Sequence, residues 1–472
     1  MSEKRHISII PLGCPKNDVD SELIAGAFKD AGYSVGWNTL KGDAAVINTC
    51  GFVKDAIDES LDAIMEAIEA KKQGYVKRVI VTGCLAQRFG KQLASQLKEV
   101  DLFVGVNGFE NIPSLMNRRV QKTLISDVPY TAYPENLTRV AYKHPHSVYL
   151  KIADGCNNRC SYCVIPYIKG KLKSRNTQDI VKEAKVLANN GAVELNIIAQ
   201  DTMNFGLDRG KNELIALLSE LEKIEGIKWI RLNYLYPSHI TNDFLSFISD
   251  SEKIVKYFDV PIQHISDRIL KSMNRSTTSD DIKRLLDTLN KKIQNPFLRT
   301  TIIVGFPGET DDDFNELIEF FNNYCFHRIG VFRYSNEEPA PASRFKNQVP
   351  EKVAVERFNR LNEFVNEQMF NLSTDFVNKT YEALIDGVDP DDPSITIARP
   401  WFFAPEIDGY IMIYPESYNG KTGMTKYTHK VPKSKGMLST VSETSSSNLV
   451  TGTFKLIKIT DAMGVDLIGE VV

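Results

Sequence analysis

The feature that most constrains this chain is a group of three closely spaced cysteines, Cys156, Cys160 and Cys163, directly after an apolar segment. The C-x3-C-x2-C spacing puts three thiolates on one loop, a donor set that suits a soft metal or an iron–sulfur cluster. Three thiolates leave one iron of a four-iron cluster without a protein ligand and open to a substrate. Zinc and a purely structural role are the weaker alternatives, because zinc usually takes four closing ligands and no histidine or fourth cysteine stands at the usual spacing.

A second set of three cysteines follows three apolar segments near the N-terminus. Cys14, Cys50 and Cys84 stand 36 and 34 residues apart, about one strand–helix unit each. Because the ends of parallel strands meet at one edge of a sheet, where ligands collect, we expect these thiols in one place. Each has a glycine beside it, which fits a tight turn next to a bulky inorganic centre. The pattern predicts a second three-cysteine cluster site, although one such cysteine alone would be a small buried hydrophobe.

The cysteine content and the N-terminus indicate a cytoplasmic protein. Seven cysteines in 472 residues are an odd, sparse set and not a disulfide scaffold. The apolar run Ile9–Leu12 is too short for a signal peptide, and no stretch of about 18 uninterrupted apolar residues predicts a membrane-spanning helix. The seventh cysteine, Cys325, is expected to be a plain core thiol, on an apolar helix face with Leu317, Phe320 and Phe321.

Residues 1–125 alternate between strand and helix patterns, which predicts a parallel α/β domain with helical crossovers. The expected strands are His6–Ile10, Ala44–Ile47, Arg78–Thr82 and Leu102–Val106, and the expected helices are Asp18–Ala31 and Asp55–Ala70. Residues 126–147 carry three prolines and little periodicity, so we interpret them as a linker.

Residues 148–375 repeat the alternation six times, which predicts a partial or full parallel (β/α) barrel with its function at the carboxyl ends of the strands. The expected strands are Val148–Ala153, Val193–Ala199, Trp229–Leu235, Tyr257–Ile262, Leu298–Val304 and Arg328–Tyr334. The expected helices include Thr177–Ala188, Glu213–Glu222, Asp280–Lys292 and Asp312–Asn323.

Residues 376–472 have short β-rich runs with no long helix between them, which predicts a small antiparallel β-barrel. The runs are Tyr381–Ile385, Ser394–Ala398, Gly409–Ile413, Gly452–Ile459 and Leu467–Val472. A stretch at about 419–448 is rich in Ser, Thr, Lys and Gly, and we expect a flexible insertion there. The fold class is therefore a multidomain α/β protein, and 472 residues agree with about three domains.

With three N-terminal cysteines, a central C-x3-C-x2-C group and a small terminal β-domain, the chain resembles the radical SAM methylthiotransferases over nearly its whole length. Within that family it most resembles the RimO branch, which modifies an aspartate of ribosomal protein S-twelve of the small subunit. The matching segments are Pro11–Asn17, Tyr236–Ile240, Val331–Ser335, Ala404–Gly409 and Asp466–Val471. The departure from the branch is the stretch at 419–448, which is longer than usual.

The resemblance implies two [4Fe–4S] clusters and S-adenosylmethionine (SAM) as cofactors. Cys156, Cys160 and Cys163 would hold the cluster that binds SAM in a radical SAM barrel. An auxiliary cluster would be held in the N-terminal methylthiotransferase domain by the other three cysteines, and the terminal domain would be a TRAM domain. The family methylates a cluster sulfur with one SAM and forms a 5′-deoxyadenosyl radical from a second. The implied partners are the ribosomal protein and an electron donor of the flavodoxin or ferredoxin type.

The resemblance also marks a Gly-Pro-Gly turn as a SAM-binding segment, although such a turn alone would equally be a plain connection after a strand. Two polar residues that flank another expected strand are further candidates, and as isolated polar residues they could equally have no role. The expected SAM contacts are Gly305, Pro307, Gly308, Glu309, Glu194 and Gln200.

The substrate carboxylate needs a cationic or hydrogen-bonding partner near the strand ends. Most surface Lys and Arg are merely solvated, so each candidate competes with that simpler role. The candidate cations are Lys16, Arg175, Arg275 and Arg333. His239 and His264 also lie near strand ends, and we interpret both as hydrogen-bonded loop histidines.

The charge of the terminal domain separates two possible substrates. Residues 376–472 contain nine Lys or Arg and twelve Asp or Glu, and the whole chain has a net charge of −3. An acidic domain suits a basic ribosomal protein better than tRNA, so nucleic acid is not expected to be the main partner. The five lysines between Lys421 and Lys435 are interpreted as a solvated loop. A tRNA adenosine methylthiotransferase and a non-catalytic iron–sulfur carrier remain the alternative functions.

Overall fold

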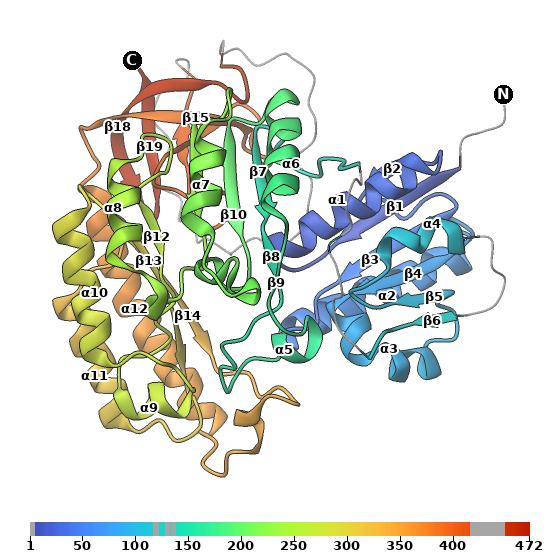
Figure 1. Ribbon diagram of the computed structural model, residues 1–472, viewed down its shortest axis with the longest axis horizontal. Helices are drawn as coiled ribbons and strands as arrows, with labels where there is room; N and C mark the ends of the chain where they lie inside the picture. Colours follow the sequence, from blue (N-terminus) through green and yellow to red (C-terminus); the bar gives the residue numbers. More distant parts are fainter. Residues whose placement is uncertain (1–4, 117–121, 128–132, 134–137, 416–448) are drawn as a thin grey trace.

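The computed structural model describes residues 5–116, 122–127, 133, 138–415 and 449–472. The chain forms a smaller N-terminal lobe, blue in Figure 1, beside a larger lobe that holds a partial barrel and a small terminal barrel. The expected insertion at about 419–448 and parts of the expected linker lie outside the described residues.

The N-terminal lobe is a six-stranded parallel sheet in the order β2-β1-β3-β4-β5-β6. Its strands are β1 (His6–Pro11), β2 (Ser34–Trp37), β3 (Ala44–Thr49), β4 (Val79–Gly83), β5 (Leu102–Val104) and β6 (Lys122–Leu124). Its helices are α1 (Pro15–Asp30), α2 (Lys54–Lys72), α3 (Cys84–Gln96), η1 (Phe109–Asn111) and α4 (Ile112–Leu115). The four expected strands and both expected helices are confirmed, whereas β2, β6 and α3 were not expected.

The central strands of this sheet are buried on both faces, which explains why they read as continuous apolar runs. Ala44 and Val46 of β3 pack with residues of α1, while Ala45 and Ile47 pack with residues of α2 and α3. Side chains alternate between the two faces of a strand, so a run of apolar residues serves both helical layers. Helix α1 lies between the sheet and the larger lobe (Figure 1).

The larger lobe contains six parallel strands in two three-stranded sheets, β11-β10-β7 and β12-β13-β14. They are β7 (Ser147–Lys151), β10 (Glu194–Ile198), β11 (Trp229–Leu232), β12 (Tyr257–Asp259), β13 (Phe297–Val304) and β14 (Arg328–Arg333). The Leu235 amide donates to the Asp259 carbonyl over 2.8 Å, and Ile230 bridges to Ile254, so the two sheets join into a partial barrel. All six expected strands are confirmed in order.

Helices cover the outside of the barrel, and a short antiparallel pair follows β7. The helices are α5 (Ile165–Ile168), α6 (Thr177–Asn189), α7 (Leu214–Glu222), α8 (Asn242–Asp250), α9 (Asp267–Ser272), α10 (Ser279–Lys292), α11 (Asp311–Asn323) and α12 (Glu351–Thr374). Short 3-10 turns are η2 (Thr202–Asn204), η3 (Leu207–Arg209), η4 (Pro237–His239) and η5 (Pro341–Arg344). The pair is β8 (Ala153–Asp154) with β9 (Lys173–Ser174).

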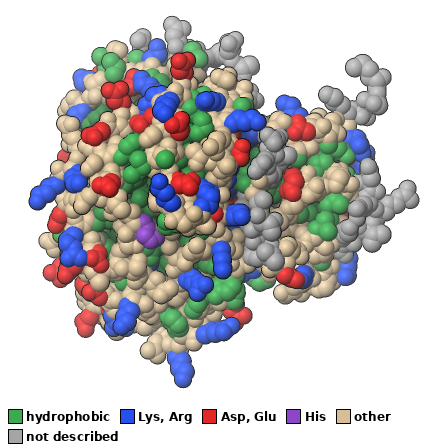
Figure 2. All heavy atoms as spheres, in the orientation of Figure 1, with side chains coloured by type: hydrophobic (Ala, Val, Ile, Leu, Met, Phe, Trp, Pro, Cys, Tyr) green, Lys and Arg blue, Asp and Glu red, His purple; other side chains and the backbone are tan. Residues whose placement is uncertain are grey.

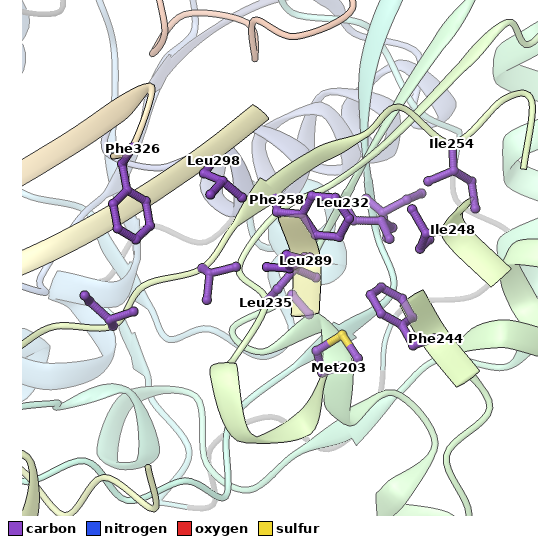
Figure 3. Close-up of a cluster of buried hydrophobic side chains, with 14 of the residues drawn as sticks. Met203, Leu232, Leu235, Phe244, Ile248, Ile254, Phe258, Leu289, Leu298 and Phe326 are labelled. Carbon is purple, nitrogen blue, oxygen red and sulfur yellow. The ribbon is translucent and has the colours of Figure 1, made fainter. Parts of the chain in front are cut away.

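The barrel core is formed by the inward sides of strands and helices together. Figure 3 shows Leu232, Phe258 and Leu298 from three strands packed near Phe244 of α8 and Leu289 of α10. The face shown in Figure 2 carries interspersed basic and acidic side chains, in agreement with the small net charge. Over the described part of the chain, no helix has both the length and the apolar character needed to cross a membrane.

The terminal domain is a closed five-stranded barrel in the order β15-β16-β17-β19-β18. Its strands are β15 (Thr380–Val388), β16 (Thr396–Pro400), β17 (Ile411–Ile413), β18 (Phe454–Met463) and β19 (Asp466–Val471). Four pairings are antiparallel as expected, but β17 pairs with β19 in parallel. The reason is that β18 returns beside β15, so β19 must close the ring against β17.

The prediction for Cys325 is wrong, because this thiol is exposed. Helix α11 ends at Asn323, so Cys325 lies beyond the apolar helix face that includes Phe320 and Phe321. The chain then turns to bury Phe326 instead, which packs 5.8 Å from Phe321 between ring centroids. The prediction assumes that helical spacing continues to residue 325, whereas the helix ends at Asn323.

Candidate functional site

The three N-terminal cysteines follow the carboxyl ends of β1, β3 and β4. Gly13 has a φ of 91°, and a Cβ there would lie 3.0 Å from the Cys50 sulfur, so the loop before Cys14 touches Cys50 directly. A Cβ on Gly51 would lie 2.7 Å from the Leu85 backbone, next to Cys84. These glycines allow the three loops to approach one another as closely as they do.

Buried amides hold the same loops together. The Asn17 side chain donates to the Thr49 carbonyl over 2.9 Å, and the Asn48 side chain donates to the Asn17 carbonyl over 2.9 Å. Ser60 of α2 accepts from the Cys50 amide over 3.0 Å and donates to the Cys50 carbonyl. The backbone around the thiols is therefore anchored on both the sheet and the helices.

The N-terminal thiols lie close enough to affect one another's ionisation. Burial raises the pKa of Cys50 to about 11, with a further contribution from Cys14. Burial also raises the pKa of Cys84 strongly, while Lys169 lowers it and Cys50 and Cys14 add to the increase. Metal ligation requires the thiolate form, so a bound cluster would displace protons that these thiols otherwise keep.

The central cysteines share one loop after β8. The Cys156 amide donates to the Gly170 carbonyl over 3.1 Å, and the Cys163 amide donates to the Cys160 carbonyl over 3.1 Å. Burial raises the pKa of Cys156 to about 11 and that of Cys163 further, with Cys160 adding to both effects. The loop thus folds back on itself and gathers the three sulfurs.

Each set of three thiols has the donor chemistry of an iron–sulfur site. Across the described residues, no three His, Cys, Asp or Glu side chains gather closely enough to hold one metal ion. A four-iron cluster takes its thiolates at separate corners, so its three cysteines stand further apart. The soft thiolate donors of both sets suit such a cluster.

Cys84 of the N-terminal set lies at the junction between the lobes. Cys84 packs in an apolar cluster with Val106 of its own lobe and with Val164, Ile168 and Ala340 of the larger lobe. Val164 directly follows Cys163, so an element of the central loop touches a cysteine of the N-terminal set. The N-terminal set therefore reaches the loop of the central set through the contact of Cys84 with Val164.

A buried ion network, not expected from the sequence, crosses this interface beside the cysteines. Asp20 of α1 pairs with Lys151, and also with Lys169 over 3.1 Å. Asp154 pairs with Lys169 over 3.2 Å and with Lys151 over 3.3 Å, and accepts from Gln200 over 2.6 Å. Although burial alone would have the opposite effect, the two lysines hold the pKa of Asp154 below its ordinary range. The network ties α1 to the barrel.

The candidate cations divide into two groups. The Lys16 ammonium reaches from the N-terminal lobe to the barrel and lies 3.6 Å from the Tyr234 ring centroid. Arg275 packs 4.0 Å above the Tyr236 ring and lies beside Cys160, whose interaction helps to raise the pKa of Arg275. These two cations adjoin the cysteines.

The other two candidate cations have structural partners. Arg175 pairs with Glu183 over 2.6 Å and donates to the Lys151 carbonyl over 2.7 Å. Arg333 pairs with Glu351, and both side chains are exposed.

Both candidate histidines are hydrogen-bonded, as expected. The His239 ring lies 3.1 Å from Asp201, which also accepts from Asn158 in the cysteine loop over 2.7 Å. His264 is fully buried, and its Nδ1 accepts from the Ser266 amide over 3.0 Å.

The Gly305-Phe306-Pro307-Gly308 turn follows β13, at the carboxyl end of the barrel. Gly305 has a φ of 73°, and a Cβ there would lie 2.7 Å from the Ala354 Cβ of α12, so packing already requires the glycine. The Glu309 carboxylate accepts from the Gly305 amide over 3.0 Å and pairs with Arg357 over 2.8 Å. Glu309 therefore closes the turn itself, and its carboxylate has internal partners.

The two remaining SAM candidates lie at opposite ends of β10. Gln200 follows the carboxyl end, and its Oε1 is buried without a hydrogen-bond partner in the described structure. Glu194 begins the strand at the amino end and pairs with Arg231 over 2.9 Å and with Arg399 of the terminal domain over 2.7 Å. The structure thus places Glu194 away from the cysteines, in the contact between the barrel and the terminal domain, which corrects its expected position.

Comparison with known proteins gives the class first. The family model described as the radical SAM superfamily matches residues 150–321, and the model described as uncharacterized protein family UPF0004 matches residues 6–105. Among solved structures, the radical S-adenosylmethionine methyltransferase TsrM from Kitasatospora setae has a TM-score of 0.51 and 15% identity, and the match covers 70% of this chain and 75% of that chain. This likeness shows the shared fold. The partial barrel with its three-cysteine loop is a radical SAM domain.

Curated relatives then give the particular family. The ribosomal protein uS12 methylthiotransferase RimO of Clostridioides difficile (strain 630) is 39% identical over 469 residues, which are 98% of each chain. The RimO protein of Caldicellulosiruptor saccharolyticus is 38% identical over 471 residues, 99% of each chain. This chain belongs to the ribosomal protein uS12 methylthiotransferase family, RimO. It is a methylthiotransferase whose cofactors are SAM and [4Fe–4S] clusters, and the expected family is confirmed.

Proposed function

We propose that this chain transfers a methylthio group to the β-carbon of an aspartate in ribosomal protein uS12. Relatives named for this activity are similar over nearly the full length of both chains. The observation that carries the proposal is the junction at which Cys84 packs against Val164, next to Cys163. A reaction that combines a radical with a cluster-borne sulfur needs both centres at one place.

The cysteines divide this work between them. Cys156, Cys160 and Cys163 would hold the SAM-binding cluster, and Cys14, Cys50 and Cys84 would hold the auxiliary cluster. When bound, these groups supply reductive cleavage of SAM and a transferable sulfur. The turn residues Gly305, Pro307 and Gly308 and the buried amide of Gln200 are the proposed SAM contacts. Glu309 would hold the turn in shape, and Glu194 is left out of the SAM site.

The surrounding residues position the two sites and exclude water. Val106, Val164, Ile168 and Ala340 form the apolar wall between the lobes. The charged network of Asp20, Lys151, Asp154 and Lys169 fixes α1 on the barrel. Dry walls protect a radical reaction from competing chemistry.

The proposed domain division supports this arrangement. Residues 1–125 carry the auxiliary site, 126–147 connect, 148–375 carry the SAM site, and 376–472 form the TRAM domain. The acidic balance of the last region suits the basic surface of a ribosomal protein. An electron donor of the flavodoxin or ferredoxin type and a cytoplasmic location complete the proposal.

Two cysteine variants test the division of labour. In the anaerobically reconstituted enzyme, Cys163→Ala should abolish 5′-deoxyadenosine formation while the auxiliary iron remains. Cys50→Ala should keep 5′-deoxyadenosine formation and lose methylthio transfer to uS12, measured by mass spectrometry. Cys325→Ala is the matched control, since this thiol is exposed and lies outside both triads. Methylthio transfer by Cys50→Ala would contradict the assignment.

The substrate is tested in cells. A deletion strain should lack the methylthio mark on uS12 and keep its tRNA modifications. Loss of a tRNA mark with the uS12 mark intact would reject the proposed substrate in favour of a tRNA adenosine. Failure of the reduced enzyme to form any 5′-deoxyadenosine would favour a non-catalytic iron–sulfur protein.

A further inference from the structure

Lys16 is a cation at the junction of the lobes, and its neighbours are a carbonyl and an aromatic ring. Its ammonium lies 3.4 Å from the Ala199 carbonyl and 3.6 Å from the Tyr234 ring centroid. Within the described residues, no carboxylate oxygen lies within the 4.0 Å of an ion pair with Lys16. An ammonium has three donors, so the long bond to the Ala199 carbonyl and the hydrogen bond with the Tyr234 side chain leave one donor for a further partner.

The neighbouring cations are engaged by other groups. Lys151 and Lys169 share Asp20 and Asp154, so two positive charges meet two negative charges. Arg275 donates to the Pro261 carbonyl over 2.6 Å and interacts with Cys160 of the central loop. Among Lys16, Lys151, Lys169 and Arg275, Lys16 is therefore the cation best able to bind an incoming anion.

The position of Lys16 connects both halves of the proposed site. It stands two residues after Cys14, yet its ammonium contacts groups that follow β10 and β11 of the barrel. In parallel barrels, substrates bind at the carboxyl ends of the strands. An anion on Lys16 would lie between the N-terminal cysteines and the barrel opening.

We propose that Lys16 binds the side-chain carboxylate of the substrate aspartate, an inference that rests on the proposed function. In aspartate the β-carbon is bonded directly to the carboxyl carbon, so a held carboxylate places the reacting carbon within two bonds of the bound oxygen. Such placement is the main contribution a protein makes to a reaction between held groups. Asparagine would leave the ammonium without an ionic partner and should be rejected.

The test compares two peptides with the reconstituted enzyme. The peptides carry the uS12 target sequence with either aspartate or asparagine at the modified position. Wild-type enzyme should modify and bind the aspartate peptide about 10- to 100-fold better. Lys16→Met should lose most of this preference, because it should weaken binding and modification of the aspartate peptide but not of the asparagine peptide. Lys16→Arg should retain part of the preference. Binding is measured anaerobically by fluorescence anisotropy of labelled peptide, and activity by mass spectrometry.

Each outcome decides between Lys16 as a carboxylate partner and a merely structural Lys16. Iron and sulfide content and 5′-deoxyadenosine formation without peptide should match wild type in Lys16→Met. If this variant loses iron, Lys16→Gln replaces it and must show the same loss of preference. Equal weakening of both peptides, as expected if Lys16 only offsets cluster charge, would overturn the inference. Failure of wild type to modify either peptide or intact uS12 would instead reject the proposed function.

Discussion

Both ends of the partial barrel are covered by another part of the chain, but with different side chains. At the carboxyl end, α1 docks through lysine–aspartate pairs beside the cysteines. At the amino end, the terminal domain docks through arginine–carboxylate pairs and stacked aromatic rings. Phe297, for example, lies 5.5 Å from Phe402 and 5.7 Å from Tyr257 between ring centroids.

The different side chains at the two ends of the barrel suit the different roles of these ends. Arginine presents a rigid, planar fork that binds carboxylates in a fixed geometry, whereas lysine carries a compact charge on a flexible stem. The amino end combines such forks with apolar area and is a permanent seal. The carboxyl end keeps charged and polar groups near a site that must admit a protein side chain. We therefore expect the amino end to determine stability and the carboxyl end to determine transfer.

The largest expected effect is at the amino end, with Glu194→Gln. Glu194 is fully buried and is shared by Arg231 and Arg399. The substitution leaves Arg231 buried without a carboxylate among the described residues, and breaking such a pair costs about 3–5 kcal/mol. The measurement is urea unfolding followed by tryptophan fluorescence, since Trp229 lies in this contact, 4.8 Å from Phe454 between ring centroids.

Glu220→Gln is the matched control for this substitution. Glu220 pairs with Lys223 on the surface, where the two side chains are 49% and 68% exposed. Exposed pairs contribute about 0–1 kcal/mol, so this variant should unfold close to wild type. Equal midpoints for the two variants would show that the arginine network does not secure the terminal domain.

At the carboxyl end, Asp20→Asn should lower stability less than Glu194→Gln does. It should lower the yield of methylthio transfer per 5′-deoxyadenosine more. Lys151 and Lys169 would keep Asp154, so the stability cost should be about 2–3 kcal/mol. Because α1 would then dock less firmly, methylthio transfer per 5′-deoxyadenosine formed should fall several-fold. Mass spectrometry of both products from one reaction measures this ratio.

Asp30→Asn on the same helix is the control for the docking effect. Asp30 is exposed and accepts from the Thr138 hydroxyl over 2.8 Å, away from the lysine network. Its product ratio should equal that of wild type. If Asp20→Asn also kept the wild-type ratio, the lysine network would have no part in aligning the two sites.

The fold was predictable where burial on both faces of a strand produces an apolar run. This holds for β3, β4, β10, β11 and β12. Strand β2 was missed because its four residues are half-buried and include Gly36, and β6 was missed because it has only three residues. The parallel pairing of β17 with β19 depends on the closed ring and has no signal in either segment.

The cysteines were predictable because their spacing alone restricts their chemistry, but their surroundings were not. Lys151 and Asp20 are 131 residues apart in sequence, and no local pattern joins them. Two features of the sequence could have indicated this ion network. Lys151 ends an apolar strand, and Asp20 lies inside a helix that is buried on both sides. Glu194 was misplaced although it is the second residue of its expected strand, since the amino end of a parallel barrel is opposite the usual site.

The smallest expected effect is a pH dependence at the amino end, through His327. Its ring stacks 4.5 Å from Phe297, and its Nδ1 accepts from the Leu298 amide over 3.1 Å. Burial, with a contribution from Arg328, lowers the pKa of His327 to about 4. The unfolded chain, with a histidine pKa of about 6.5, therefore binds the proton more readily, and stability is fully present above about pH 6.5 and falls toward about pH 4.

From about pH 7 to about pH 5, this one group should remove about 2 kcal/mol from the free energy of unfolding. In His327→Gln the side chain does not titrate, so its unfolding free energy should lose that part of the slope, whatever the substitution costs at pH 7. The comparison uses urea unfolding of both proteins at several pH values, and the two should run parallel above about pH 7. Identical slopes below pH 7 would mean that the proton enters elsewhere and that the amino-end seal is insensitive to mild acid. A steeper slope in wild type would show that the contact of the barrel with the terminal domain depends on a neutral imidazole as well as on charged pairs.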